Sequence, residues 1–158
     1  MAAGTRAWSR AGLVLGLVLV VDQVSKRLVR HGIAPGDEDS VFPGVSLVHT
    51  QNRGVAFGAF EDQTWVVTAI IGLAVLALVV YFATHLDRPL IWLPTGLLAG
   101  GALGNIFDRI RDGAVTDFIK LPAWPAFNVA DMAITFGVLA LLLVLEQSER
   151  ADAADAGP

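Results

Sequence analysis

Three long apolar stretches and a shorter one at the start restrict the folds open to this chain. Trp65–Thr84 has 20 residues and no charge, and Leu90–Phe107 has 18 residues and no charge. Val129–Leu145 has 17 residues, of which Asp131 alone is charged, and the first stretch, Ala11–Val21, is shorter. A helix that crosses the roughly 30 Å hydrocarbon core of a bilayer needs about 20 apolar residues. The stretches therefore predict membrane-spanning helices.

The first stretch reaches a spanning length only if the polar residues after it belong to the same helix. From Ala7 to Arg30 the chain is long enough, with its charged end at the headgroups. A removable signal peptide has a similar apolar core, but no small-residue cleavage site follows, so we expect a retained helix. The expected spans cover about residues 9–30, 65–84, 90–108 and 129–146.

The composition agrees with an integral membrane protein. Hydrophobic residues make up 54% of the chain and charged residues 16%, below the roughly 25% typical of soluble domains. We expect one domain over residues 1–147 and a disordered polar tail over 148–158. The absence of cysteine excludes disulfides, thiolate metal sites and a cysteine nucleophile. The net charge of −4 and the lack of a basic patch disfavour nucleic acid as a partner.

Two of the connections between the spans carry structural signals. SLVHT and VAFGAF flank the turn-like QNRG and predict a small β-hairpin within residues 32–62. IKLPAWPAF, with Trp124 and two prolines, suits a short interfacial helix at the bilayer surface. Four spans place both termini on one side of the membrane and the hairpin on the other. The expected fold is an all-α integral membrane protein with a small β element.

The third span carries a packing pattern and a polar end. Gly96, Gly100 and Gly104 recur every four residues, a spacing that lets two helices approach closely. Asn105 and Arg109 follow, one turn apart. Polar groups at this depth must face protein or water rather than acyl chains. An ordinary helix end at the headgroups explains Arg109 well and Asn105 poorly.

The first helix carries a charged pair. Asp22 and Lys26 are four residues apart with the acid first, the favoured order for an ion pair within a helix. The pair either neutralises two charges near the membrane edge or orients and charges a site. The sequence alone leaves both interpretations open.

Two acids at the ends of spans are the candidate catalytic groups. Asn128 precedes a helix and Asp131 follows it by three residues, a capping-box spacing, so Asp131 alone could serve the helix terminus. Asp117 alone could be an ordinary loop acid. The two lie on the same side of the membrane, however, and a short connection can bring them together. Two close carboxylates share one proton. One can then take a proton from water while the other polarises a peptide carbonyl, which hydrolyses the peptide without a covalent intermediate.

Rival hydrolytic chemistries lack their residues. The chain has no G-x-S-x-G elbow and no H-E-x-x-H zinc motif. His31, His49 and His85 are scattered. Ser25 and Lys26 are adjacent and point apart on a helix, so they cannot pair as a Ser-Lys dyad. Carboxylate chemistry remains.

A carrier or proton channel is the alternative from another functional class. Membrane acids often mark ion pathways, and Asp131 with Asp108 could form one. Against this alternative, the sequence has no clear internal repeat, and the third and fourth spans have no acid near their middle. A scaffold without chemistry is a third alternative.

Five short motifs carry a resemblance to a known family. They are DQVSK (22–26), NRGVAFG (52–58), GGALGNIFDR (100–109), VTDF (115–118) and FNVAD (127–131). In this order and spacing they resemble the lipoprotein signal peptidases of bacteria, also called signal peptidase II. The resemblance covers nearly the whole chain except the tail. It departs from the family pattern at Val55, where alanine is common, and at Gly58, where serine is common.

The resemblance implies a membrane aspartyl endopeptidase without metal or organic cofactor. Such enzymes remove the signal peptide from prolipoproteins that carry a diacylglyceryl group on cysteine, cutting just before that cysteine. Asp117 and Asp131 would be the catalytic dyad. The residues implied to bind substrate or support the dyad are Asn52, Gly54, Asn105, Arg109, Asn128, Asp22 and Lys26. The expected partners are lipid-modified prolipoproteins and membrane lipids, and a monomer is sufficient.

The implied orientation conflicts with the charge distribution. The family is multi-pass in the bacterial cytoplasmic membrane, with both termini in the cytoplasm and the active site and β element near the outer face. The inner side would then carry Arg6, Arg10, Arg88 and Arg150, and the outer side Lys26, Arg27, Arg30, Arg53, Arg109, Arg111 and Lys120. The positive-inside rule favours the reverse. We follow the motifs, because much of the outer charge lies in or beside them.

Overall fold

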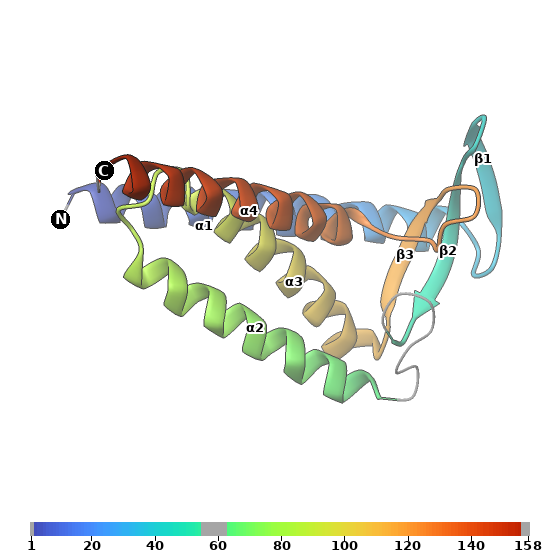
Figure 1. Cartoon of the computed structure of the whole chain (residues 1–158). Helices are drawn as coiled ribbons and strands as arrows, with labels where there is room; N and C mark the ends of the chain where they lie inside the picture. The colour runs from blue at the N-terminus through green and yellow to red at the C-terminus, as the bar shows by residue number, and fades with distance from the viewer. Residues whose placement is uncertain (1, 55–62, 156–158) are drawn as a thin grey trace.

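Four helices and a small sheet make up the computed structural model, which describes residues 2–54 and 63–155. In chain order the elements are α1 (Ala2–Gly32), β1 (Glu38–Phe42), β2 (Val45–Asn52), α2 (Thr64–Thr84), α3 (Trp92–Asp112), β3 (Val115–Lys120) and α4 (Val129–Asp155). The sheet lies at one end of the helices, and both chain ends lie at the other (Figure 1). We call these the sheet end and the terminal end.

The four predicted spans correspond to the four helices, and two of them meet a strict span criterion. Thr64–Thr84 and Val129–Arg150 are long and apolar enough to cross a membrane. α1 and α3 instead bury charged side chains in the protein, among them Asp22, Lys26 and Asp108. Large apolar side chains are nevertheless exposed on all four helices, as expected for surfaces that face lipid.

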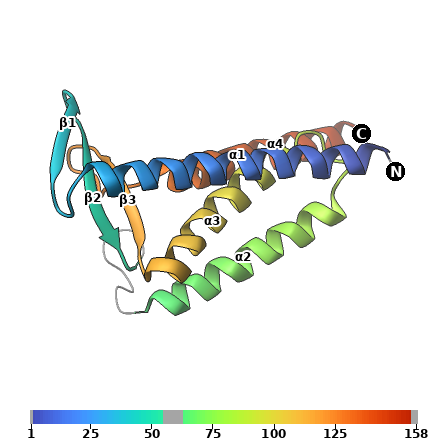
Figure 2. The same cartoon turned by 180° about the vertical axis from the view of Figure 1, so that it is seen from behind.

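α3 is the central helix of the bundle. It runs diagonally from beside α1 and α4 to the sheet end of α2, and α2 leans away from α1 and α4 in both views (Figures 1 and 2). The glycine pattern explains the close packing of α3 on α1. A Cβ at Gly96 would lie 2.7 Å from the carbonyl oxygen of Ala11, and one at Gly104 would lie 2.7 Å from an Asp22 carboxylate oxygen. The predicted packing face, which includes Gly100, is confirmed.

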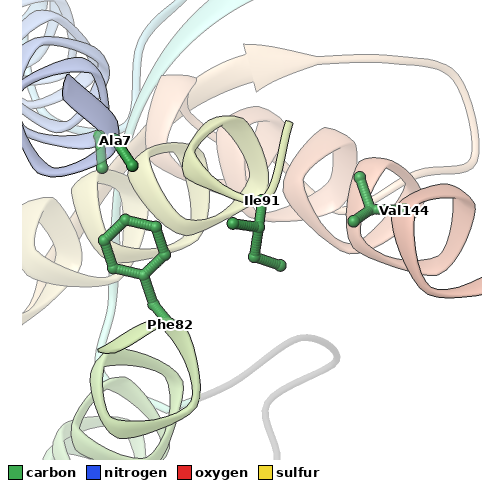
Figure 3. Close-up of a cluster of buried hydrophobic side chains, with 5 residues drawn as sticks. Ala7, Phe82, Ile91 and Val144 are labelled. Carbon is green, nitrogen blue, oxygen red and sulfur yellow. The ribbon is translucent and has the colours of Figure 1, made fainter. Parts of the chain in front are cut away.

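A small apolar cluster fastens the terminal end. Its buried members are Ala7, Ala11, Phe82, Ile91 and Val144, from α1, α2, the start of α3 and α4 (Figure 3). Phe82 and Ile91 are almost fully buried, at 0% and 1% exposed. A second apolar cluster, of Val29, Ile33 and Phe118, packs the end of α1 against β3 at the sheet end.

The sheet is antiparallel with the order β1-β2-β3. The predicted strand SLVHT forms part of β2, whereas its predicted pairing across QNRG stays a prediction. β2 pairs with the preceding strand β1, with Ser40 opposite Ser46, and the predicted partner at 55–60 lies outside the described residues. β3 replaces the loop expected around Asp117, because its sequence lacks the pattern of a strand. Its first four residues are buried, so the alternation that reveals a half-exposed strand is missing.

Two further expectations differ from the structure. The segment 121–127 forms turns and an isolated bridge between Ile119 and Phe127 rather than an interfacial helix. Its two prolines lack backbone N–H donors, and Ala123 has a φ of 57°, outside the helical region. At the other end of α4, the expected disordered tail is helical as far as Asp155. Arg150 and Glu146 form an ion pair one turn apart that supports this extension.

Candidate active site

The route of the chain after α3 brings Asp117 to the helices. Gly113 ends α3 with a φ of 71°, a left-handed conformation that glycine adopts without strain, and its N–H donates to the carbonyl of Arg109. The chain then turns directly into β3. Pairing with β2 sets Thr50 opposite Asp117, and the Thr50 hydroxyl donates to the Asp117 carbonyl at 3.1 Å. The backbone at Asp117 is therefore held within a sheet.

Asn128 joins the two acids. Its Nδ2 donates to Asp117 Oδ1 at 2.7 Å, and its backbone N–H donates to Asp131 Oδ2 at 3.1 Å. The Asp131 N–H in turn donates to Asn128 Oδ1 at 2.9 Å. This reciprocal pair is a capping box at the start of α4. The capping interpretation of Asp131 is confirmed, and the cap also fixes the orientation of this carboxylate beside Asn128.

Side-chain amides occupy the remaining carboxylate oxygens. Asn52 Nδ2 donates to Asp117 Oδ2 at 3.0 Å, and Asn105 Nδ2 donates to Asp131 Oδ1 at 2.8 Å. Asp117 is only 3% exposed. Asp131 is half-buried, and each oxygen of the two acids accepts one N–H, so both carboxylates have fixed orientations. This is the environment in which neighbouring carboxylates share a proton.

The protonation of Asp117 follows from its surroundings. Burial, followed by the negative charge of Asp131, raises the pKa of Asp117 from 3.8 to about 6. The hydrogen bonds from Asn52 and Asn128 and the positive charge of Lys26 oppose this rise. Asp117 can therefore carry a proton under mildly acidic conditions in which an exposed aspartate is ionised.

This pKa predicts a pH dependence of stability. Between about pH 4 and pH 6 the folded chain binds a proton at Asp117 that the unfolded chain has released, so stability falls as pH rises through this window. About two pKa units correspond to about 3 kcal/mol. Asp117→Asn should remove this loss. The melting temperatures of the wild type and of Asp117→Asn in detergent, at pH 4.5 and at pH 7, measure this loss. Equal changes of melting temperature with pH in the two proteins would contradict the raised pKa of Asp117.

A buried ion cluster lies behind the acids. Lys26 Nζ contacts Asp22 Oδ2 at 2.8 Å, Asp108 Oδ2 at 3.0 Å and Asn105 Oδ1 at 2.9 Å. Its three N–H donors are thus matched by three acceptors. The predicted pairing of Asp22 with Lys26 is confirmed, and both side chains are 0% exposed. Through Asn105, which donates to Asp131, the cluster connects to the two acids and positions one of them.

Asp22 also ties the first helix to the fourth. Its Oδ1 accepts a 2.9 Å hydrogen bond from the N–H of Ala130, in the first turn of α4. A carboxylate at a helix N-terminus is favoured by the free N–H groups and the helix dipole. The start of α4, and Asp131 with it, is therefore held by α1. This connection favours the site-orienting interpretation of the charged pair over simple neutralisation.

Arg109 connects the acids to a hollow between α2 and α3. Its Nη2 donates to the Gly54 carbonyl at 2.8 Å, while its buried Nε and Nη1 have no hydrogen-bond partner within residues 2–54 and 63–155. The Gly54 N–H donates to Asn52 Oδ1 at 3.0 Å, and Asn52 donates to Asp117, so hydrogen bonds connect Arg109 with Asp117. The hollow measures about 780 Å³. Its lining comprises Arg53, Thr64, Trp65, Thr68, Ala69, Arg109, Ile110, Asp112 and Gly113.

All nine residues that the sequence indicated lie in one network of hydrogen bonds and ion pairs. They are Asp22, Lys26, Asn52, Gly54, Asn105, Arg109, Asp117, Asn128 and Asp131. The structure adds Gln23, Thr50 and Asp108. Asp108 was expected only as a possible partner of Asp131 in an ion pathway, but it pairs with Lys26.

The added residues differ in how visible they were. Gln23 donates to Asp22 and Asp108, and it stands next to Asp22 in the first motif. Asp108 stands next to Arg109 in the third motif. Thr50 lies outside all five motifs, so no sequence pattern indicated that it contacts the site. Within the described ranges no group of three or more His, Cys, Asp or Glu side chains is placed to hold a metal ion.

Comparison with known proteins identifies the family. A family model described as Signal peptidase (SPase) II matches residues 14–146, most of the chain. The chain belongs to the signal peptidase II family. Among its relatives, the lipoprotein signal peptidase of Syntrophomonas wolfei is 43% identical over 136 residues, which cover 85% of this chain and 91% of that protein. The lipoprotein signal peptidase of Moorella thermoacetica is 43% identical over 129 residues, covering 79% and 85%.

Solved structures of two bacterial membrane enzymes have the same fold as this signal peptidase II chain. One, determined in meso at 2.3 Å resolution, gives a TM-score of 0.82 at 29% identity and covers 88% of both chains. The other, at 1.9 Å resolution, gives a TM-score of 0.76 at 30% identity and covers 85% of this chain and 91% of its own. The helices with their end sheet are therefore the arrangement of a bacterial membrane enzyme.

Proposed function

We propose that this chain is a lipoprotein signal peptidase that removes the signal peptide from bacterial prolipoproteins, with Asp117 and Asp131 as its catalytic dyad. Family membership supports the activity. The single observation that supports the dyad is the position of Asn128, which donates to both carboxylates. The proposed scissile bond is the one just before a cysteine that carries a diacylglyceryl group.

The proposed reaction uses water as the nucleophile. The ionised carboxylate of the pair takes a proton from water as the oxygen attacks the scissile carbonyl carbon, and the protonated carboxyl donates its proton to the carbonyl oxygen. Collapse of the tetrahedral intermediate breaks the C–N bond, and the amine of the lipidated cysteine leaves with a proton from the dyad. The pair titrates as a unit, and the raised pKa of Asp117 favours the resting proton there.

Asn128 would keep the acids poised for these transfers. Its side chain is fully buried, and it is held by Asp117, Asn105 and the backbone of α4. Donors that are fixed before substrate arrives do not reorganise during the reaction. The amide donors around the dyad therefore orient it without competing for its proton.

The membrane arrangement supports the same proposal. We propose four spans, with α1 and α3 crossing alongside the two strongly apolar helices, in the cytoplasmic membrane. Both chain ends would face the cytoplasm, and the sheet and dyad would lie near the outer face, on opposite ends of the molecule (Figure 1). A signal peptide is an apolar helix and a diacylglyceryl group is two acyl chains, so both partition into the bilayer. A dyad at the membrane surface would therefore lie at the depth of the scissile peptide bond, which joins the signal peptide to the lipidated cysteine.

The hollow between α2 and α3 is the proposed substrate entrance. Apolar and polar side chains share its lining, from Trp65 and Ile110 to Thr68 and Arg109. Arg109 has buried donors that a substrate carbonyl could accept from. A peptide that entered between these helices would approach the dyad along the Arg109 side.

Release of signal peptide from purified prolipoprotein in detergent micelles tests the function. The matched substrates share one peptide sequence, with and without the diacylglyceryl group on cysteine. Diacylglyceryl-modified substrate should be cut before the cysteine, with a new peptide carboxylate and a free cysteine amine as products. Equal cutting of both substrates would refute the lipid requirement, and no cutting of either would refute the function.

A further inference from the structure

A second hollow lies where the end of α1, the strand β2 and the end of α3 meet. It measures about 570 Å³. Its lining comprises Arg27, Arg30, His31, Gln51, Arg111 and Asp112. It shares Asp112 with the proposed substrate entrance, but neither acid of the dyad lines it. Arginines of two helices, Arg27 and Arg30 of α1 and Arg111 of α3, thus converge on one hollow, and the chemistry proposed above uses none of them.

Positive charge is in excess around this hollow. Arg111 forms a close pair with Asp112, with Nη2 and Oδ2 separated by 2.6 Å. Arg30 lies 3.8 Å from the same carboxylate and donates to the Thr116 hydroxyl at 3.0 Å, so its guanidinium is fixed at the wall. Arg27 is exposed, and within residues 2–54 and 63–155 its guanidinium forms no hydrogen bond or ion pair. The lining thus holds one carboxylate and three guanidinium groups, and Arg30 also lies 4.0 Å from the buried Asp108, which pairs with Lys26.

Exposed apolar side chains adjoin the arginines on both helices. On α1, Val24 and Leu28 flank Arg27 and are 52% and 69% exposed. On α3, Phe107 and Ile110 precede Arg111 and are 48% and 76% exposed. In a membrane protein such side chains face acyl chains, so the cationic groups next to them lie at the level of the lipid phosphates.

We propose that this hollow binds the phosphate of an anionic phospholipid headgroup. Guanidinium groups present several N–H donors in a fixed fork that matches phosphate oxygens. Arg30 would supply a fixed donor, Arg27 an unpaired one, and Arg111 a third next to the acyl chains. Basic pockets between membrane helices on the cytoplasmic side bind anionic headgroups by such contacts, and the proposal extends this binding to the outer side. The proposal does not depend on the dyad.

The lipid site also accounts for the charge distribution of the chain. Lys26 and Arg109 are buried and bound within the protein, whereas Arg27 and Arg111 remain exposed at the sheet end. The positive-inside rule disfavours such charges on the outer side. Binding of anionic lipid would retain them there for a structural reason.

Native mass spectrometry of the full chain in detergent tests the proposal. The probes are phosphatidylglycerol and phosphatidylcholine with identical acyl chains. The wild type should retain one phosphatidylglycerol in preference to phosphatidylcholine. A cation near an anionic lipid surface contributes about 1 kcal/mol, or about fivefold. The Arg27→Gln/Arg111→Gln double variant should therefore bind phosphatidylglycerol about 25-fold more weakly.

Three comparisons keep the result interpretable. Arg27→Gln alone removes no hydrogen bond or ion pair between described residues and should weaken binding about fivefold, whereas Arg27→Lys, which keeps the charge but not the fork, should weaken it less. Arg150→Gln, at the terminal end, should bind like the wild type. The proposal is overturned if both lipids bind equally, if the double variant keeps its preference, or if Arg150→Gln loses as much. Displacement of the lipid by millimolar inorganic phosphate would assign the site to free phosphate instead.

Discussion

Asp117→Asn and Asp131→Asn should each reduce signal-peptide release by roughly 10³-fold or more, since general acid–base catalysis by a positioned group contributes about 10²–10⁴-fold. An amide of the same shape can neither take a proton from water nor give one to the scissile carbonyl. The dyad needs both functions, so loss of either acid stops the reaction. Release of signal peptide from diacylglyceryl-modified substrate, measured as an initial rate, gives the comparison.

The same variants must remain folded for this result to bear on catalysis. Asparagine keeps the volume of aspartate and one acceptor oxygen, so either variant should keep the helices and sheet. Melting in detergent checks this. Asp39→Asn is a matched control, because Asp39 lies on the exposed edge strand β1, away from the dyad, and its rate should equal that of the wild type. A dyad variant that kept the wild-type rate would contradict the assignment.

Lys26→Met should destabilise the folded chain by about 3–5 kcal/mol, because it leaves the carboxylates of Asp22 and Asp108 buried without their cation. Both carboxylates are 0% exposed, so water cannot compensate them. Chemical denaturation in detergent measures the loss. Lys120→Met, on the half-buried end of β3, changes a lysine outside this cluster and should have a much smaller effect.

A compensated variant separates the lost charge from the lost packing. Asp22→Asn/Lys26→Met/Asp108→Asn removes all three charges and should recover much of the stability lost in Lys26→Met. Its activity should stay low, because Asn105 loses the ammonium that its oxygen accepts from, and Asn105 orients Asp131. If Lys26→Met and Lys120→Met cost the same, the cluster would not stabilise the fold as we describe.

The helices were predictable because a bilayer imposes a length. The apolar stretch 65–84 and the helix Thr64–Thr84 differ by one residue, since polar flanks mark where a span leaves the hydrocarbon. The sheet was not predictable in this way. β1 is fully exposed and begins with two acids, while β3 begins with four buried residues, so neither alternates as a half-exposed strand does.

The candidate site was visible where residue type and spacing carried a physical meaning. Asn128 and Asp131 fit a capping box, and Asp22 and Lys26 fit a helical ion pair, so local geometry alone related the members of each pair. The contacts between residues far apart in the sequence could not be predicted. Asp117 reaches Asn52 only because β3 pairs with β2, a contact that no local pattern encodes.

A single turnover in H₂¹⁸O tests most directly whether Asp117 and Asp131 activate water. Excess enzyme is mixed with diacylglyceryl-modified prolipoprotein, and the released signal peptide is weighed by mass spectrometry. Water attack predicts one ¹⁸O in the new peptide carboxylate on the first turnover and none in the Asp117 or Asp131 carboxylates. An unlabelled peptide carboxylate, with ¹⁸O in one of these aspartates instead, would mean that a carboxylate oxygen attacked the peptide, and would contradict the account.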